Sequence, residues 1–166
     1  MILYLLRHGI AEDHARRGGD AERELTDEGK DRTRNTLLAA RKMKLLPPQL
    51  VISSSLRRAQ QTAEIALESF AKGAEFETSE ALTPMSELSL TMALVTERAK
   101  VYNGIMLVGH EPHLSHFGSA LLGSTTPVLE MKKASLAKFE IQRFDVPRMR
   151  GFLVALLPPK IGEVCL

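Results

Sequence analysis

The sequence contains almost no cysteine. Cys165 is the single cysteine among 166 residues, so no disulfide can form within the chain. Proteins without disulfides are typical of reducing compartments. The apolar residues 1–6 lack a basic leader and form a run about one strand long, too short for a signal peptide or a membrane span. We therefore expect a cytoplasmic protein that has no membrane partner.

The sequence also lacks a large excess of charge of either sign. Its 22 basic and 20 acidic side chains leave a net charge of +2, which is too small to indicate a nucleic acid as partner. Apolar residues make up 44% of the chain, as in ordinary globular proteins. No repeat, low-complexity tract or linker interrupts the pattern. The sequence therefore predicts a single domain over residues 1–166, which we expect to be a monomer.

Short apolar runs predict the strands. Such runs cover residues 1–6, 50–53, 105–108 and 152–157. Runs that are apolar at nearly every position are typical of strands buried on both faces, as in a parallel sheet covered by helices. Residues 135–142 alternate between apolar and polar side chains, which predicts a strand at the edge of the sheet.

Helical patterns separate these strands. Thr26 is a suitable N-cap for a helix that ends before Pro47 and Pro48. Further helices are predicted over residues 59–70, 86–99 and 112–122, and loops over residues 15–24 and 144–150. The alternation of strands and helices predicts an α/β fold, with a mostly parallel central sheet and helices on both faces in a three-layer sandwich.

Arginine and histidine follow three of the predicted strands. Arg7 and His8 come directly after the first, Arg57 and Arg58 after the second, and His110 after the third. In open α/β sheets, ligands bind beyond the carboxyl ends of the strands, so we expect these side chains to meet. Taken singly, each junction has an ordinary explanation as a solvated turn. Together they predict a pocket for an anion that needs no metal.

The types of these residues point to phosphate. A guanidinium group is always charged and matches two phosphate oxygens at once, and imidazole can act as a nucleophile near neutral pH. Arg57 and Arg58 lie in the first turn of a predicted helix, where the helix dipole disfavours cations. An anion bound between them would explain their position.

The three junctions resemble the motifs of the histidine phosphatase superfamily, the phosphoglycerate-mutase-like proteins. Its Arg-His-Gly triplet is matched by Arg7, His8 and Gly9. Its Ser-Pro-x-x-Arg-Ala-x-Gln-Thr-Ala motif is similar to residues 54–63, with Ser55 in place of the usual proline. Its Gly-His pair is matched by residues 109–110.

Two shorter segments support the same resemblance. Residues 23–29 are similar to the family's Arg-x-Leu-Thr-x-x-Gly segment, and residues 82–84 match a Leu-Thr-Pro segment. The small size and these segments resemble the SixA-type phosphohistidine phosphatase branch. The resemblance implies a phosphoglycerate-mutase-like fold and a phosphatase activity that requires no cofactor and no metal.

The resemblance also implies a role for each residue. His8 attacks phosphorus and forms a phosphohistidine, which water then hydrolyses. Arg7 and Arg58 hold the non-bridging oxygens, and His110 is a further donor to the charge that builds during transfer. We expect the arginines to lower the pKa of His8, and a backbone carbonyl near Gly9 to fix its tautomer.

Gly9, Arg23 and Arg57 are further candidates for contact with the substrate, Gly9 because it lets the backbone turn and a ligand approach closely. For each of the two arginines, a solvated surface charge is an alternative. The proton donor is harder to predict. Glu80 is the chosen candidate, with a solvated loop glutamate as its alternative.

Several functions stay open at this point. We expect a phosphorylated protein as partner, because a phosphohistidine expels imidazole easily and needs no strong acid. A small phosphate ester is the alternative substrate, and a phosphate-type or sulfate-type anion should bind the site in either case. A mutase and a non-catalytic phosphate-binding module are further alternatives. His110, His113 and His116 suggest a metal site, but their spacing does not align them on a helix.

Overall fold

The structure is a computed structural model that describes residues 1–15, 17–145 and 148–161. Cys165 lies outside the described residues. The six strands are β1 (Ile2–Arg7), β2 (Leu50–Ser53), β3 (Glu75–Thr78), β4 (Gly104–Gly109), β5 (Leu136–Asp145) and β6 (Arg148–Leu157). The helices are α1 (Asp27–Lys42), α2 (Arg57–Ser69), α3 (Leu88–Arg98) and α4 (His113–Leu121), with short 3-10 helices η1 (Asp20–Glu22) and η2 (Glu80–Leu82). None of the described helices is long and apolar enough to span a membrane.

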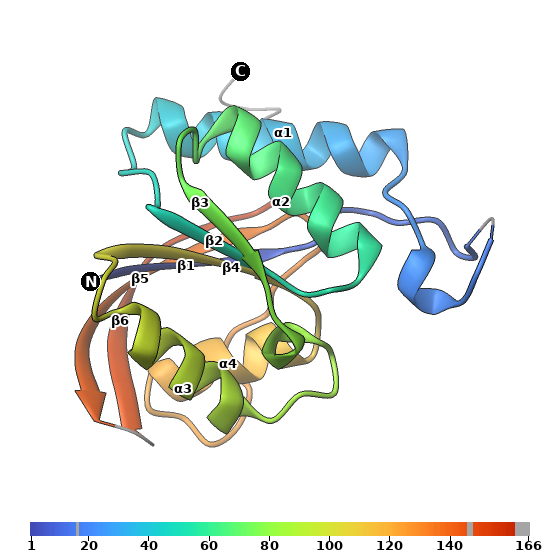
Figure 1. Cartoon of the computed structure of the whole chain (residues 1–166). Helices are drawn as coiled ribbons and strands as arrows, with labels where there is room; N and C mark the ends of the chain where they lie inside the picture. The colour runs from blue at the N-terminus through green and yellow to red at the C-terminus, as the bar shows by residue number, and fades with distance from the viewer. Residues whose placement is uncertain (16, 146–147, 162–166) are drawn as a thin grey trace.

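The strands form one mixed sheet in the order β3-β2-β4-β1-β5-β6. The first four are parallel, whereas β5 and β6 form an antiparallel hairpin beside β1. Helices α1 and α2 cover one face of the sheet and α3 and α4 cover the other (Figure 1). The predicted α/β class and three-layer arrangement are confirmed.

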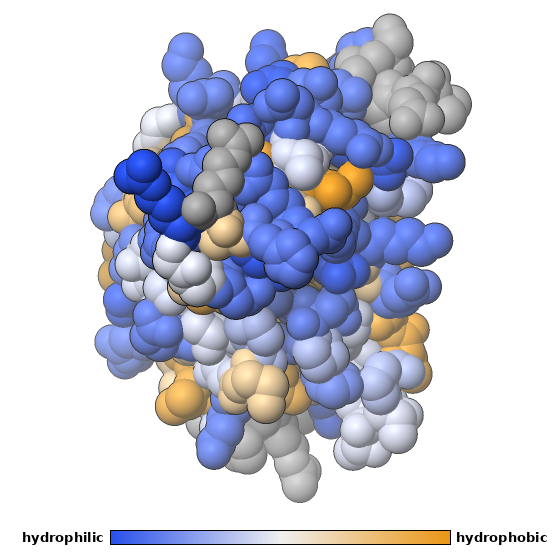
Figure 2. Space-filling model, turned by 90° about the vertical axis from the view of Figure 1, so that its right-hand side faces the viewer, coloured by the Kyte–Doolittle hydropathy of each residue, from blue (hydrophilic) through white to orange (hydrophobic). Residues whose placement is uncertain are grey.

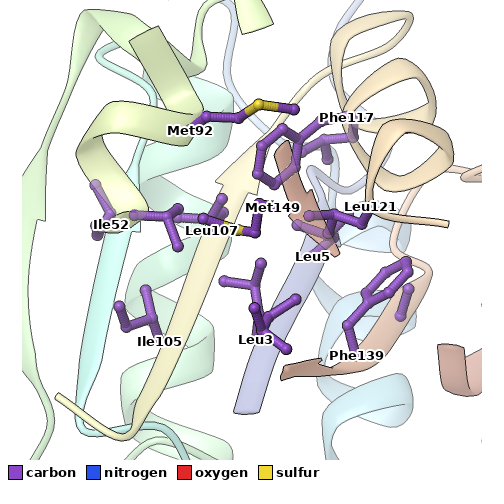
Figure 3. Packing of buried hydrophobic residues seen from close by; sticks show 14 of the residues in the cluster. Leu3, Leu5, Ile52, Met92, Ile105, Leu107, Phe117, Leu121, Phe139 and Met149 are labelled. Atoms are coloured by element: carbon purple, nitrogen blue, oxygen red, sulfur yellow. The ribbon is translucent and has the colours of Figure 1, made fainter. Parts of the chain in front are cut away.

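Alternate residues of the central strands supply two hydrophobic clusters, one on each face of the sheet. Tyr4 and Met106 face α1 and α2, and both are fully buried. Leu5 and Leu107 face the other way, where Phe117 of α4 packs against them (Figure 3). Because both faces are covered, β1 and β4 are apolar at nearly every position, which is the pattern that revealed them in the sequence.

The positions of β5 and β6 in the sheet differ from those predicted. β5 lies between β1 and β6 and is not at the edge. Its alternation reflects a sheet covered on one face only, which an interior strand can also have. β6 is the edge strand, and its apolar run includes the exposed side chains Phe152 and Val154. The loop predicted over 144–150 is also wrong where the structure describes it, because both strands extend into it; residues 146–147 lie outside the described residues.

The strand β3 at the opposite edge was not predicted. Its sequence Glu75–Thr78 is mostly polar, and Phe76 is exposed at 45%. An edge strand that faces solvent on both sides has no apolar pattern to reveal it. Its carboxyl end leads into η2, which returns the chain toward the end of β4.

The start of α1 supports the loop that follows β1. Thr26 caps this helix as predicted, since its side chain accepts the backbone N–H of Gly29 at 3.0 Å. The backbone N–H of Thr26 in turn donates to the carbonyl of Ile10 at 2.9 Å. A Cβ atom added to Gly29 would lie 2.0 Å from that carbonyl oxygen, so only glycine allows this approach.

The close contact between Gly29 and the Ile10 carbonyl predicts that alanine at position 29 destabilises the protein. Replacing a helical glycine by alanine ordinarily stabilises a protein by up to about 1 kcal/mol. For Gly29→Ala we expect the opposite, a loss of about 1–3 kcal/mol in the free energy of unfolding, because the new methyl group meets backbone that cannot move aside cheaply. Urea denaturation measures the difference.

The matched control is Gly19→Ala, since a Cβ atom there has no neighbour within 4 Å. We expect that variant to change the free energy of unfolding by less than about 0.5 kcal/mol. A Gly29→Ala protein more stable than the wild type would contradict this account of the contact.

Candidate active site

Three strand ends meet at the carboxyl edge of the sheet. β4 lies between β1 and β2, and the register pairs Arg7 with Gly109 and Ser53 with Val108. The backbone N–H of His8 donates to the Gly109 carbonyl at 3.0 Å. The three junctions are therefore neighbours, as the sequence predicted. Figure 2 views the molecule from the side on which the loop after β1 lies in Figure 1, and this face is mainly hydrophilic.

His8 is held in one tautomer. Its side chain is buried, and Nδ1 lies 2.7 Å from the carbonyl oxygen of Gly9. A carbonyl can only accept, so Nδ1 of the neutral ring carries the proton and donates it. Nε2, on the other side of the ring, therefore keeps its lone pair, as a nucleophile requires. The expected carbonyl near Gly9 is confirmed.

The surroundings also keep His8 neutral. Burial lowers the pKa of His8 to about 3, and the charges of Arg58, Arg7 and Lys133 act in the same direction, whereas the bond to the Gly9 carbonyl opposes them. The predicted effect of the arginines has the right sign. Burial, the largest cause of the lowered pKa of His8, was not predicted, because the sequence does not show how deeply a side chain at a strand end is buried.

His110 lies beside His8, with the ring centroids 4.8 Å apart. Its Nε2 lies 2.9 Å from the hydroxyl oxygen of Ser54, which already accepts the backbone N–H of Leu56 at 3.3 Å. The Ser54 hydroxyl still has a proton to donate to Nε2, and in that arrangement the ring proton of His110 lies on Nδ1. That buried Nδ1 has no partner in the described part of the chain, so it is available as a donor to a ligand.

Burial lowers the pKa of His110 to about 2, and the charges of His8, Arg58 and Arg7 add to the effect. The ring is thus neutral at physiological pH. It can donate one hydrogen bond to an anion, but it brings no positive charge of its own.

Arg7 is anchored by one of its nitrogens. The Nη1 group donates to the carbonyl of Met131 at 2.7 Å, whereas Nε is buried without a partner among the described residues. Burial lowers the pKa of the guanidinium, and the carboxylates of Glu111 and Glu130 raise it. A guanidinium that is fixed in place and incompletely paired is suited to bind an anion.

Arg58 already holds an anion from within the chain. Its Nη2 group lies 3.1 Å from Oδ2 of Asp20, and Nη1 donates to the Asp20 backbone carbonyl at 2.9 Å. The other carboxylate oxygen of Asp20 lies 2.8 Å from Nη1 of Arg23. The hydrogen bond from Arg23 and the charge of Arg58 lower the pKa of Asp20. Asp20 thus links Arg23 to Arg58.

Arg57 and Glu80 form no hydrogen bond or ion pair with these side chains in the described part of the chain. The Arg57 guanidinium lies 3.3 Å from Glu64 and 3.8 Å from Glu24, so carboxylates of the protein account for its position in the first turn of α2. Glu80 is exposed in η2, on the side where β3 ends. Their predicted roles, in substrate binding and proton donation, stay predictions.

Gly9 allows the turn after β1 to pack closely against α1, and its contact with a substrate stays a prediction. A Cβ atom there would lie 2.7 Å from the Gly29 carbonyl oxygen and from the Thr33 hydroxyl, so close packing against α1 requires glycine. Its N–H donates to the Thr62 hydroxyl at 3.2 Å, and its carbonyl accepts from His8. Both backbone groups of Gly9 are therefore already used in holding His8.

Three further side chains around the site, those of Asp20, Ser54 and Glu111, were not predicted from the sequence. Asp20 was part of a predicted loop, and nothing local indicates that it reaches Arg58 across 38 residues. Ser54 belonged to a quoted motif, but its bond to His110 depends on the neighbouring strands. Glu111 follows His110 directly, and burial raises the pKa of its carboxyl group although Ser115 and Arg7 oppose this.

The histidines that suggested a metal site are engaged elsewhere. Both ring nitrogens of His113 have partners, with Nε2 2.8 Å from the Thr91 hydroxyl and Nδ1 3.1 Å from the Ser86 carbonyl. His116 is exposed on α4. Among residues 1–15, 17–145 and 148–161, no group of three acidic, histidine or cysteine side chains is arranged to hold a metal ion.

The fold and this edge of the sheet define an α/β protein with an oxyanion site made of two guanidinium groups and two neutral imidazoles. The His8 ring presents a lone pair, and the His110 ring has a buried Nδ1 without a partner among the described residues. Such a set can take up a phosphoryl group and stabilise its transfer by position and charge.

The comparisons with known proteins agree with this description. The family model of the histidine phosphatase superfamily (branch 1) matches residues 3–89, and the chain belongs to this family. The match includes His8 and Arg58 but ends before His110. An uncharacterized protein of Picosynechococcus sp. is 37% identical over 139 residues, which cover 82% of each chain.

Solved structures show the same fold. The protein histidine phosphatase SixA, complexed with tungstate, has a TM-score of 0.84 at 22% identity, over 96% of this chain and 97% of that one. A mycobacterial glucosyl-3-phosphoglycerate phosphatase with VO3 has a TM-score of 0.70 at 20% identity, over 93% and 97%. Family and fold together support a phosphatase with a site for a phosphate-type anion.

The buried His8 gives the stability a pH dependence of known sign. Its pKa is about 3 in the folded protein against 6.5 ordinarily, so the unfolded chain takes up the proton first as the pH falls. Stability present above about pH 6.5 is therefore lost down to about pH 3, by up to about 1.4 kcal/mol per pH unit. We expect His8→Asn to make this decline shallower, as measured by urea denaturation over that range.

His14→Asn is the control, because it changes an exposed histidine of the same loop region. It should keep the wild-type slope. If His8→Asn also declined as steeply as the wild type, the assignment of a buried neutral imidazole would be wrong.

The contact between Asp20 and Arg58 predicts that Asp20 weakens the binding of anions to the site. An oxyanion that binds Arg58 must displace or share the contact with the Asp20 carboxylate. We expect Asp20→Asn to bind inorganic phosphate roughly three to ten times more tightly in calorimetric titration. Asp31→Asn, which removes an exposed partner of Arg34 on α1, should leave the affinity unchanged. Weaker phosphate binding by Asp20→Asn would show that Asp20 supports the anion site.

Proposed function

We propose that this protein is a phosphatase that removes the phosphoryl group from phosphohistidine on a protein, with His8 as the nucleophile. The observation that supports it most strongly is the bond from Nδ1 of His8 to the Gly9 carbonyl at 2.7 Å. It leaves the Nε2 lone pair free on a buried ring that stays neutral among cations. No other arrangement at this site so directly suits attack on phosphorus.

In the first step, the lone pair of Nε2 of His8 forms a bond to phosphorus while the bond to the substrate imidazole nitrogen breaks. That nitrogen leaves with the electron pair and takes up a proton. In the second step, a water oxygen attacks phosphorus and the bond to Nε2 breaks. Inorganic phosphate departs, the proton of the water passes to solvent or phosphate, and His8 is restored.

The remaining side chains stabilise the transferred group. Arg7 and Arg58 hold the non-bridging oxygens, Arg58 after exchanging its contact with Asp20 for the substrate. The Nδ1–H of His110 donates to the same oxygens. Removing one such donor costs on the order of 3–4 kcal/mol in comparable oxyanion sites. Arg23, Arg57 and Gly9 contribute to substrate binding less directly, through the loop and the helix that carry the site.

Two features favour a phosphoprotein. Only residues 54–56 connect β2 to α2, and only residues 110–112 connect β4 to α4, so neither connection is long enough to form a lid. The longer connection over residues 8–26 reaches the site through Asp20, on Arg58. A site that the two short connections leave uncovered can admit a side chain that protrudes from another protein. A phosphohistidine also needs little acid catalysis, because the conjugate acid of imidazole has a pKa of about 6.5.

A small phosphate ester is the second candidate substrate. Its favouring observation is Glu111, whose carboxyl group has a raised pKa and could protonate an alkoxide leaving group. Glu80 is the other carboxyl group proposed for that role. An ester phosphatase depends on such a donor, whereas a phosphohistidine phosphatase does not.

The test compares a phosphohistidine protein with a panel of phosphate esters, for the wild type and for His8→Ala. We expect turnover of the phosphohistidine protein to exceed that of the esters. Loss of the nucleophile should lower turnover of every substrate by about a thousandfold or more, on the scale of removed nucleophiles in other enzymes.

His14→Ala serves as the matched control, since it removes an exposed histidine that, within the described part of the chain, forms no hydrogen bond or ion pair with the site residues. It should turn over each substrate as the wild type does. Wild-type activity in His8→Ala would overturn the mechanism, and faster turnover of an ester would favour the second candidate.

A further inference from the structure

A basic pocket of about 530 Å³ opens beside the catalytic edge of the sheet. Five cationic side chains and one carboxylate line it, namely Arg7, Arg32, Lys132, Lys133, Lys160 and Glu130. Arg7 lines this pocket and also lies close enough to His8 to lower its pKa, so the pocket adjoins the phosphoryl site. The whole chain carries a net charge of only +2, so this pocket concentrates positive charge far above the average.

Most of this charge has no ion-pair partner in the described part of the chain. Arg32 pairs with Glu28 at 2.6 Å. Among the described residues, no ion pair involves Lys132, Lys133 or Lys160. Like charges gathered in a concave surface repel one another and focus a positive potential there. Such a potential attracts anions.

The backbone fixes two of these lysines next to His8. The N–H of Ala134 lies 3.2 Å from the Arg7 carbonyl and 3.1 Å from the His8 carbonyl, and Ser135 accepts the Arg7 N–H at 3.1 Å. Ala134 itself has a φ of 63°, in the left-handed region that alanine rarely adopts. Strain of this kind persists where surrounding contacts enforce it, and it often marks functional segments. Lys132 and Lys133 directly precede this turn.

We propose that this pocket binds a second anionic group of the substrate, beside the phosphoryl group that His8 attacks. The inference rests on the proposed function, under which the second group is an aspartate or glutamate side chain next to the phosphohistidine. The pocket would then select phosphoproteins whose modified histidine lies in an acidic surface. Arg7 connects the two subsites, because it faces both.

The test uses two phosphohistidine peptides that differ only in their flanking residues, Asp and Glu in one, Asn and Gln in the other. We expect kcat/KM of the wild type to be about tenfold higher for the acidic peptide at low salt. This preference should shrink as the salt approaches about 0.5 M, because exposed charges are then screened.

The pocket variant is Lys132→Ala with Lys160→Ala, which leaves Arg7 and Lys133 intact beside His8. It should reduce the acidic preference to about twofold or less. The matched control is Lys44→Ala with Lys72→Ala, two exposed lysines before the amino ends of β2 and β3. That control should keep the wild-type preference.

The outcomes separate the pocket from the proposed function. Equal turnover of both peptides by the wild type would overturn the pocket and leave the phosphohistidine activity standing. Turnover of p-nitrophenyl phosphate but of neither peptide would overturn the phosphohistidine substrate. In that case, turnover of a small bisphosphate is compared with turnover of its monophosphate analogue. A preference of the wild type for the bisphosphate that is lost in the pocket variant would support the second anion site. Equal turnover of the two compounds by the wild type would overturn it.

Discussion

The hydrogen bond from Nδ1 of His8 to the carbonyl of Gly9 is the contact on which the site depends. It sets which nitrogen of a buried neutral ring carries the proton, and therefore which nitrogen can attack. The surrounding packing serves this contact. Gly9 fits against α1 only because it lacks a side chain, and the Thr62 hydroxyl of α2 binds its N–H. Contacts with α1 and α2 thus fix the turn after β1, and this turn orients the imidazole of His8.

Burial gives this imidazole its second property. A histidine surrounded by arginines in water would still be protonated in part near its ordinary pKa, whereas burial lowers the pKa of His8 to about 3. The same burial leaves the guanidinium groups of Arg7 and Arg58 incompletely solvated. Arg7 donates a hydrogen bond to the Met131 carbonyl, and Arg58 forms an ion pair with Asp20. A phosphoryl group can supplement or replace each of these contacts.

Much of the architecture could be predicted from the sequence, because strands buried on both faces are apolar at nearly every position. This pattern located β1, β2 and β4, and the chemistry follows their carboxyl ends. The pattern failed for strands that helices cover on one face only or on neither face. β5 was expected at the edge of the sheet and β6 in its interior, and β3 was not expected at all. The contact of Asp20 with Arg58 was also beyond prediction, since it joins two segments that only the fold brings together.

The measurement that tests the central claim most directly identifies the phosphorylated atom. Wild-type protein would be quenched during turnover and its phosphohistidine examined by phosphorus and nitrogen NMR. We expect a single phosphoryl group bonded to Nε2 of His8. Phosphorus on Nδ1, on His110 or on no histidine would contradict it, because the bond to Gly9 would then not select the nucleophile.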